Sequence, residues 1–152
     1  MIKKNLLLFS ILVSLYSYSQ NIYEEKFEGC NTKRFALESE IETAKKDKNE
    51  LIKLLTKHIT NDAQQKLRGK LKLQIIVYMD GTSCLLSYEN NTKLSSDELK
   101  IELIKELVDN ELVWMNGKEN IAALVELRFK RKEITLKRYG MNAKSGWHEL
   151  KE

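Results

Sequence analysis

The chain of 152 residues contains no proline and only two histidines and two cysteines. Without proline it has no stiff, extended spacer of the kind that proline-rich segments form. His58 and His148 are far apart in the sequence, and neither has a second ligand three or four residues away, which is the spacing of a helical metal site. No glycine-rich phosphate loop and no nucleophile elbow occurs. We therefore expect no metal, no cofactor, no catalytic residue and no small-molecule substrate, which means a protein that is not an enzyme.

The first 20 residues, MIKKNLLLFSILVSLYSYSQ, have the three parts of a secretory signal peptide. Lys3 and Lys4 precede an apolar run over residues 6–15, and small and polar residues follow. The run is shorter than the roughly 20 residues that a membrane-spanning helix needs. We expect residues 1–20 to be cleaved and the mature chain to begin near Asn21, in the periplasm or outside the cell. An uncleaved inner-membrane anchor is the less favoured alternative.

The charge of the expected mature chain is close to balanced. Without Lys3 and Lys4 it has 24 basic residues against 22 acidic residues, a formal charge of +2. So small an excess is not the signature of a nucleic-acid-binding protein. The remaining chain, about 130 residues, is long enough for one domain that buries roughly two thirds of the surface exposed by its unfolded form.

Both cysteines, Cys30 and Cys84, lie in the expected mature chain, and export would place them where disulfides form. An even number suits one disulfide, and two buried free thiols are the alternative. A bridge would close a loop of about 55 residues and stabilise the fold by about 4 kcal/mol on the chain-entropy model. Nothing in the sequence pairs Cys84 with His58 as a nucleophile and its base.

The spacing of apolar residues predicts a helix followed by two strands. Apolar residues over 35–59 recur mostly three or four apart, which predicts a helical face with a polar interruption at residues 45–50. We favour a single helix, and two helices that meet at the interruption are the alternative. From Leu71 to Met79 they recur at every second residue, which predicts a strand with one face in the core. Residues 84–88 alternate in the same way, so we expect a second strand there.

Asp80 and Gly81 separate the two alternating runs and predict a β-hairpin. We expect a two-residue type I′ turn, in which both residues adopt positive φ, because glycine does so freely and aspartate tolerates it. A calcium loop needs a repeated series of oxygen ligands, and no such series surrounds Asp80. We therefore assign Asp80 to the turn rather than to a metal or acid–base site.

A second helix and a closing strand are predicted after the hairpin. Ser95 and Glu98 have the spacing of a capping box, and the apolar face that follows predicts a helix ending at Asn110. We expect Trp114 to pack in the core. Alternation over residues 121–129 predicts a strand.

The alternation breaks at residues 130–133, KRKE, and the next three residues, ITL, continue in the opposite phase. Either a bulge or a turn into a further short strand would account for this change. Residues 139–152 contain two glycines and no period, so we expect an irregular tail.

Several of these segments together resemble the C-terminal domain of TonB. They are Gly69-Lys70, the strand LKLQIIVYMDG, the capped helix, and the ending with Trp114, Gly117 and the run from Ala123 to Phe129. The chain is most similar to the small exported TonB-like proteins of Bacteroidetes-type bacteria, in which a Gly-Cys segment and a helix precede the domain. Gly29-Cys30 and residues 35–59 match that arrangement, and the likeness is best over residues 69–129.

The resemblance implies an α+β fold with a three-stranded antiparallel sheet, made by the hairpin and the closing strand, packed on one or two helices. After the signal peptide we expect a leading segment with the amphipathic helix (residues 21–68), a TonB C-terminal-like domain (residues 69–138) and the irregular tail (residues 139–152).

The resemblance also implies a way of binding. TonB C-terminal domains take an extended segment of an outer-membrane transporter as an added strand on an exposed sheet edge, where unpaired backbone groups template it. By this likeness the edge would be the closing strand, with Ile121, Ala123, Val125, Leu127 and Phe129. We expect an exported interaction module that binds a protein or peptide of the cell envelope, or a second copy in a homodimer. The alternative is a structural or accessory envelope protein whose sheet edge is covered and which captures no strand.

Overall fold

The computed structural model describes residues 20–131 and 133–152, so the predicted signal peptide lies outside the described residues except for Gln20. In chain order the described elements are β1 (Glu25–Lys26), β2 (Ala36–Leu37), α2 (Lys48–Leu55), α3 (Asn61–Lys66), β3 (Gly69–Val77), β4 (Ser83–Thr92), α4 (Ile101–Asn110), β5 (Ile121–Lys130), β6 (Glu133–Asn142) and β7 (Gly146–Glu149).

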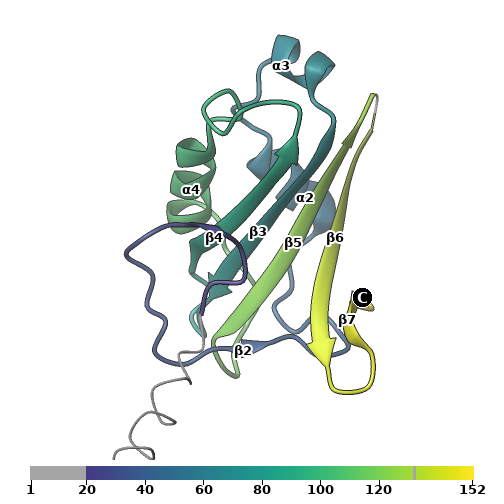
Figure 1. Ribbon diagram of the computed structural model, residues 1–152. Helices are drawn as coiled ribbons and strands as arrows, with labels where there is room; N and C mark the ends of the chain where they lie inside the picture. The colour runs from purple at the N-terminus through teal and green to yellow at the C-terminus, as the bar shows by residue number, and fades with distance from the viewer. Residues whose placement is uncertain (1–19, 132) are drawn as a thin grey trace, which may run out of the picture.

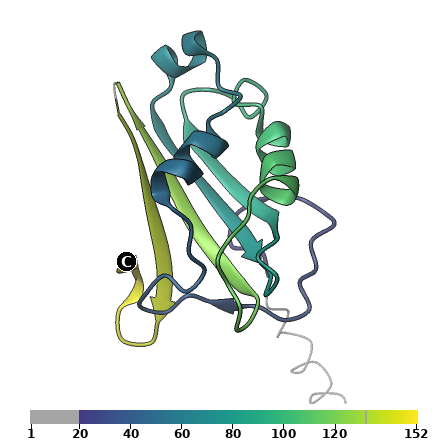
Figure 2. The same cartoon turned by 180° about the vertical axis from the view of Figure 1, so that it is seen from behind.

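These strands form one sheet in the order β1-β4-β3-β5-β6-β7, and β2 pairs in parallel with the start of β5. All other strand pairs are antiparallel. Helices α2 and α4 lie behind the sheet in Figure 1 and in front of it in the reverse view of Figure 2. The predicted α+β class is therefore confirmed, but the sheet is wider than the three strands expected, because residues before β3 and after β5 extend it.

The period-two pattern of β3 places its residues as predicted. Leu71, Leu73 and Ile75 are fully buried and belong to the main core, while Lys70 and Lys72 lie on the opposite face. Strand β3 pairs along its whole length with both β4 and β5, so it is the centre of the sheet. A central strand has no free backbone edge, and its register is fixed by two neighbours.

The hairpin between β3 and β4 is confirmed, but the predicted type I′ turn is wrong. The amide of Gly81 donates to the carbonyl of Tyr78, and the amide of Tyr78 donates to the carbonyl of Thr82, both near 3 Å. Gly81 has a φ of 85°, whereas Asp80 is not among the described residues with positive φ. The loop is therefore a three-residue connection, in which a type I turn is followed by a left-handed glycine.

Gly81 is required for a second reason. Its carbonyl accepts from the amide of Trp114, and a β-carbon on Gly81 would lie 2.5 Å from the carbonyl oxygen of Trp114. The hairpin turn is thus packed directly against the segment that enters β5.

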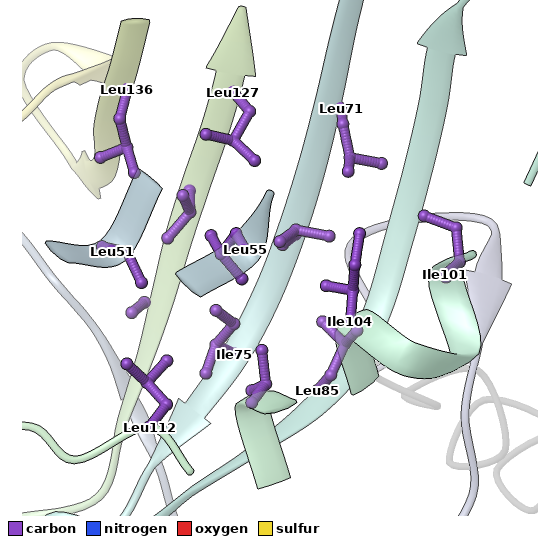
Figure 3. Packing of buried hydrophobic residues seen from close by; sticks show 14 of the residues in the cluster. Leu51, Leu55, Leu71, Ile75, Leu85, Ile101, Ile104, Leu112, Leu127 and Leu136 are labelled. Carbon is purple, nitrogen blue, oxygen red and sulfur yellow. The ribbon is translucent and has the colours of Figure 1, made fainter. Parts of the chain in front are cut away.

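The main core lies between the sheet and the helices (Figure 3). Leu51 and Leu55 of α2 and Ile104 of α4 pack onto the inner faces of β3, β4 and β5. Trp114 is buried in the same cluster, as predicted. Its ring lies under the guanidinium of Arg138, with 5.2 Å between the charged carbon and the ring centroid.

The prediction of a single helix over residues 35–59 is wrong. Residues 36–37 form β2, and the helix begins only at Lys48, where the side chain of Asp47 accepts from the amide of Glu50 and caps the first turn. Some of the apolar residues before Asp47 pack elsewhere than those after it, although Ala44 lies in the main core with Leu51 and Leu55. Phe35 and Leu37 pack in a second cluster on the outer face of the sheet. The apparent helical stripe therefore combines residues from two separate layers.

The predicted capping box forms, but it does not begin α4. The amide of Ser95 donates to the Glu98 carboxylate, and the amide of Glu98 donates to the Ser95 hydroxyl. This pair closes a separate turn, because Lys100 has a left-handed φ of 55° and the helix starts at Ile101. The predicted end of the helix at Asn110 is confirmed.

The prediction of an irregular tail over residues 139–152 is wrong. The chain reverses between Lys130 and Glu133, β6 pairs antiparallel with β5 from Glu133 to Tyr139, and β7 then pairs back onto residues 139–142. Gly140 lies inside β6, and a β-carbon there would overlap the backbone oxygen of Glu38. This glycine permits a close approach between backbones, and it does not mark the end of regular structure.

Residues 20–37, which we call the N-terminal strap, begin in front of β3 and β4 on the outer face of the sheet, loop out past β4 and return to β5 as β2 (Figure 1). The amide group of Gln74, a buried residue of β3, accepts from the amide of Ile22 and donates to the carbonyl of Gln20. A disulfide joins Cys30 of the strap to Cys84 of β4. Of the two alternatives for the cysteines, the structure has the bridge.

Among the described residues no helix is long and apolar enough to cross a membrane.

Candidate functional site

The predicted partner-binding edge is not an edge. Strand β5, with Ile121, Ala123, Val125, Leu127 and Phe129, pairs with β3 on one side over residues 121–129. On its other side it pairs with β6 from Leu124 onward and with β2 at residues 121–122. All five side chains are buried in the main core. The prediction fails because the chain's own residues 133–142 take the position that an added strand would occupy.

The outer edge of β6 is open over the first half of the strand. The backbone groups of β6 point alternately toward β5 and away from it. The amide of Met141 donates to the carbonyl of Glu38 on the β5 side, and the carbonyl of Arg138 accepts from the amide of Leu150 on the opposite side. Odd-numbered residues of β6 therefore direct their backbone groups toward β5, and even-numbered residues direct theirs outward. Strand β7 pairs only with residues 139–142. Within the described part of the chain, the outward backbone groups of Ile134 and Leu136 have no backbone partner.

The opposite edge of the sheet, along β4, is closed over its first half. Strand β1 pairs with Ser87 and Tyr88, and the amide of Phe27 donates to the carbonyl of Leu86. The amide of Leu85 donates to the carboxylate of Asp109 from α4, at 2.8 Å. Side chains and the strap thus satisfy backbone groups on this side that would otherwise template another strand.

Side chains beside the open edge differ on the two faces. Ile134 and Leu136 pack against the main core, whereas Glu133, Thr135 and Lys137 alternate with them on the outer face. A small pocket of about 170 Å³ lies beside the β5–β6 turn, with Leu67, Phe129 and Ile134 among its apolar lining residues and Lys130, Arg131 and Glu133 among its charged ones.

The outer face of the sheet carries a transverse row of charges. Strand pairing places Glu89, Lys72, Glu126 and Lys137 side by side on β4, β3, β5 and β6. Lys72 forms an ion pair with Glu89 at 3.1 Å, and Glu126 forms one with Arg128 at 3.0 Å. Glu126 is buried, and its second cation, that of Lys70, lies 3.7 Å away.

A groove of about 580 Å³ lies over part of this row. The strap at residues 21–23 lines it together with Trp147 of β7, and its lining also includes Leu124, Glu126 and Tyr139. Burial raises the pKa of the Tyr23 phenol well above its usual range, and the carboxylates of Glu89 and Glu126 raise it further. At the pH of most cells this phenol is therefore neutral and remains a hydrogen-bond donor.

A buried charge cluster holds the strap's continuation against β6. The guanidinium of Arg138 pairs with Glu38 and lies 3.7 Å from the carboxylate of Glu42. Glu38 also accepts from the amides of Thr43 and Ala44. Because these carboxylate bonds run to neighbouring backbone, we assign the cluster to the structure of this corner rather than to chemistry.

The residues considered for catalysis or metal binding are not assembled into a site. Cys84 is in the disulfide, so it offers no thiolate for nucleophilic attack. His148 is within hydrogen-bonding distance of Gly146 in its own hairpin, and the described residues contain no group of three His, Cys, Asp or Glu side chains that could hold a metal ion. Asp80 bonds to the amide and the hydroxyl of Thr82, and these bonds lower the pKa of its carboxyl. Its assignment to the turn is confirmed.

Comparison of the chain with protein-family models, with curated proteins and with solved structures finds no match.

The open edge of β6 was not predicted, although one sequence signal pointed to it. The alternation of apolar residues restarts at residues 134–136, in the opposite phase, after four charged residues. In the structure this change marks a turn and a new strand rather than a bulge, since the pairing of β5 with β6 is regular from Lys130 to Leu124. The groove had no comparable signal, because its walls come from residues 21–23 and Trp147, which are more than 120 positions apart.

Proposed function

We propose that this protein is an exported, non-enzymatic interaction module that binds an extended segment of a cell-envelope protein as an added strand on the outer edge of β6. The observation that carries the proposal is that the outward backbone groups of Ile134 and Leu136 have no backbone partner among residues 20–131 and 133–152, while β7 pairs with the second half of the same edge. Unpaired edge groups template another strand.

Export is supported by two features. Residues 1–20 have the pattern of a cleaved signal peptide, and the Cys30–Cys84 bridge suits an oxidising compartment such as the periplasm. The resemblance of residues 69–129 to the TonB C-terminal domain supports the mode of binding. In this chain β6 occupies the place beside β5, so the proposed added strand would lie one position further out.

The open stretch is short, and its size limits the partner. Two outward positions, two residues apart, offer pairing for a strand of about four or five residues at the usual rise of about 3.4 Å per residue. Side chains of the added strand would alternate between the neighbourhood of Thr135 and Lys137 on the outer face and that of Ile134 and Leu136 on the inner face.

The proposal is tested by removing one outward donor. Proline at position 134 removes an amide that makes no bond to β5, and proline is tolerated on edge strands. We expect Ile134→Pro to lose partner capture in cross-linking pull-downs from the native envelope while its thermal unfolding stays cooperative. Ile134→Ala keeps the amide and should capture the partner as wild type does. Equal capture by Ile134→Pro and wild type would refute strand addition at this edge.

Hydrogen exchange gives a second test at the same positions. In the free protein, we expect the amides of Ile134 and Leu136 to exchange rapidly, whereas those of Thr135 and Lys137, which face β5, exchange slowly. Addition of the partner, or formation of an edge-paired homodimer, should slow exchange at Ile134 and Leu136 alone.

The second candidate is a structural or accessory envelope protein that captures no strand. It is favoured by the observation that the chain covers both sides of β5 and much of the β4 edge with its own residues. This alternative predicts that exchange at Ile134 and Leu136 remains rapid in the intact envelope.

A further inference from the structure

The groove on the outer face lies apart from the β6 edge and has a lining of its own. One wall is the strap at residues 21–23, which Gln74 and Ser87 hold in place through hydrogen bonds to the amides of Ile22 and Tyr23. The other wall is Trp147, which pairs across β6–β7 with Met141. At about 580 Å³, the groove falls within the size range of small-ligand sites.

The apolar part of the groove is exposed to solvent. Trp147 is 51% exposed and Met141 is 45% exposed, and strand pairing places both on the face that carries the groove. Tyr139 on β6 continues this lining, and its direct partner on β5, Leu124, also lines the groove but is buried. Most large apolar side chains of the described residues are in the core. An exposed tryptophan beside a groove therefore marks a surface suited to stacking.

The charges of the groove are paired with one another. Glu126 lies between Lys70 and Arg128, and Lys72 is paired with Glu89. Beside the groove, Lys137 donates to Glu149, and this bond raises the pKa of the lysine. Such mutual pairing leaves little net field to attract an anion or a cation.

The same pairs still offer hydrogen bonds of both kinds. Ammonium groups and the Tyr23 phenol donate, and the carboxylates accept. A purely apolar ligand would remove these charged groups from water without replacing their hydrogen bonds, which is unfavourable. The groove therefore fits a ligand that carries many groups able both to donate and to accept, together with an apolar face for Trp147.

We propose that this groove binds a neutral oligosaccharide, with one sugar ring stacked on Trp147 and its hydroxyl groups bonded to Lys70, Lys72 and Glu126. Sugar hydroxyls both donate and accept, and the C–H face of a pyranose ring is apolar. This inference does not depend on strand addition at β6.

The binding is measured by NMR titration of the two tryptophan indoles with four probes: chitotetraose, cellotetraose, maltotetraose and, as an anionic comparison, tetragalacturonate. At least one neutral probe should shift the Trp147 indole signal in a saturable way. Trp114 is 3% exposed and serves as the internal reference, whose signal should not move.

The decisive variants are Trp147→Ala and Met115→Ala. Trp147→Ala should weaken binding of the same probe, measured by calorimetry, by about tenfold, which is the size of a good aromatic contact. Met115 is more exposed than Trp147 but lines a different hollow, so Met115→Ala should bind within about twofold of wild type. Trp147→Phe keeps an aromatic ring, and its affinity for the probe should lie between those of wild type and Trp147→Ala.

Three results would overturn the inference. The first is that none of the three neutral probes binds at millimolar concentration. The second is that Trp147→Ala binds its probe as tightly as wild type does. The third is that tetragalacturonate binds more tightly than any neutral probe and that high salt abolishes its binding. Because Trp147→Ala leaves the β6 edge at residues 134–136 intact, partner capture by this variant separates failure of this inference from failure of the proposed function.

Discussion

Removal of the Cys30–Cys84 disulfide is expected to destabilise the protein strongly. The two cysteines are 54 residues apart. On the chain-entropy model, opening a loop of this length returns about 14 cal/mol/K to the unfolded chain, which amounts to about 4 kcal/mol at 25 °C. For a chain of this length, that loss lowers the melting temperature by roughly 10 °C.

The perturbation is the double variant Cys30→Ala/Cys84→Ala, since alanine leaves no hydroxyl in the small cluster of Ile76, Leu86 and Ala122 beside the bridge. Stability is measured by urea denaturation with linear extrapolation. Wild type under reducing conditions is the matched control and should unfold close to the variant. In both, amide exchange at Ile22, which Gln74 protects, should become faster.

A double variant whose free energy of unfolding lies within about 1 kcal/mol of the oxidised wild type would refute this reasoning. Such a result would mean that the hydrogen bonds and the β1 pairing hold the strap without the bridge.

Three further predictions concern the rest of the fold. Gly140→Ala should lower the free energy of unfolding by about 1–3 kcal/mol in urea denaturation, because its β-carbon would overlap the backbone of Glu38. Arg138→Met should cost about 3–5 kcal/mol in the same assay, because it leaves Glu38 buried without its counter-ion. The hydrogen bonds from Thr82 lower the pKa of the Asp80 carboxyl in the folded state. The stability that the ionised carboxyl contributes is therefore present above the pKa of the unfolded state and is lost as pH falls through the pKa of the folded state. Asp80→Asn should therefore differ from wild type in melting temperature at neutral pH and match it in strong acid.

Each of these predictions has a matched control or a contrary outcome. Gly117→Ala is the control for Gly140, because nothing lies within 4 Å of a β-carbon built there, and it should be nearly neutral. Lys130→Met breaks an exposed ion pair with Glu133 and should cost at most about 1 kcal/mol. Equal losses for Arg138→Met and Lys130→Met would contradict a special role for the buried pair. A difference between Asp80→Asn and wild type that persisted in strong acid would contradict the hydrogen-bond account of Asp80.

The central part of the fold could be predicted because its sequence patterns are local. The alternation of apolar residues in β3 and β5 predicts two strands, the glycine after Asp80 predicts the hairpin, and the apolar face of α4 predicts a helix. Each of these patterns lies within a short run of neighbouring residues. The exact turn could not be predicted, since Asp-Gly suits both a two-residue and a three-residue loop, and the contact of Gly81 with Trp114 selects between them.

The flanking segments could not be predicted because their residues are placed by distant partners. The spacing of Phe35 and Leu37 fits a helical stripe, yet both pack on the outer face of the sheet, with Ile76 and Ala122. Gly140 suggested an irregular tail, whereas a close backbone neighbour about 100 positions earlier requires it. The candidate edge was misplaced for a different reason, because the segment after residue 133 was expected to be at most a short strand, whereas β6 pairs with β5 from Glu133 to Tyr139.

The buried pair of Glu38 and Arg138 has a consequence for how the molecule is made. Its partners are separated by 100 residues, and Lys48 and Glu152 are separated by 104. During synthesis, therefore, the residues around Glu38 exist for most of the elongation time without the groups that will enclose them. Contacts this remote in sequence form slowly, since the long intervening loop must close first. The last strands to emerge thus complete the domain, because a chain halted before Arg138 would lack the cation that pairs with Glu38.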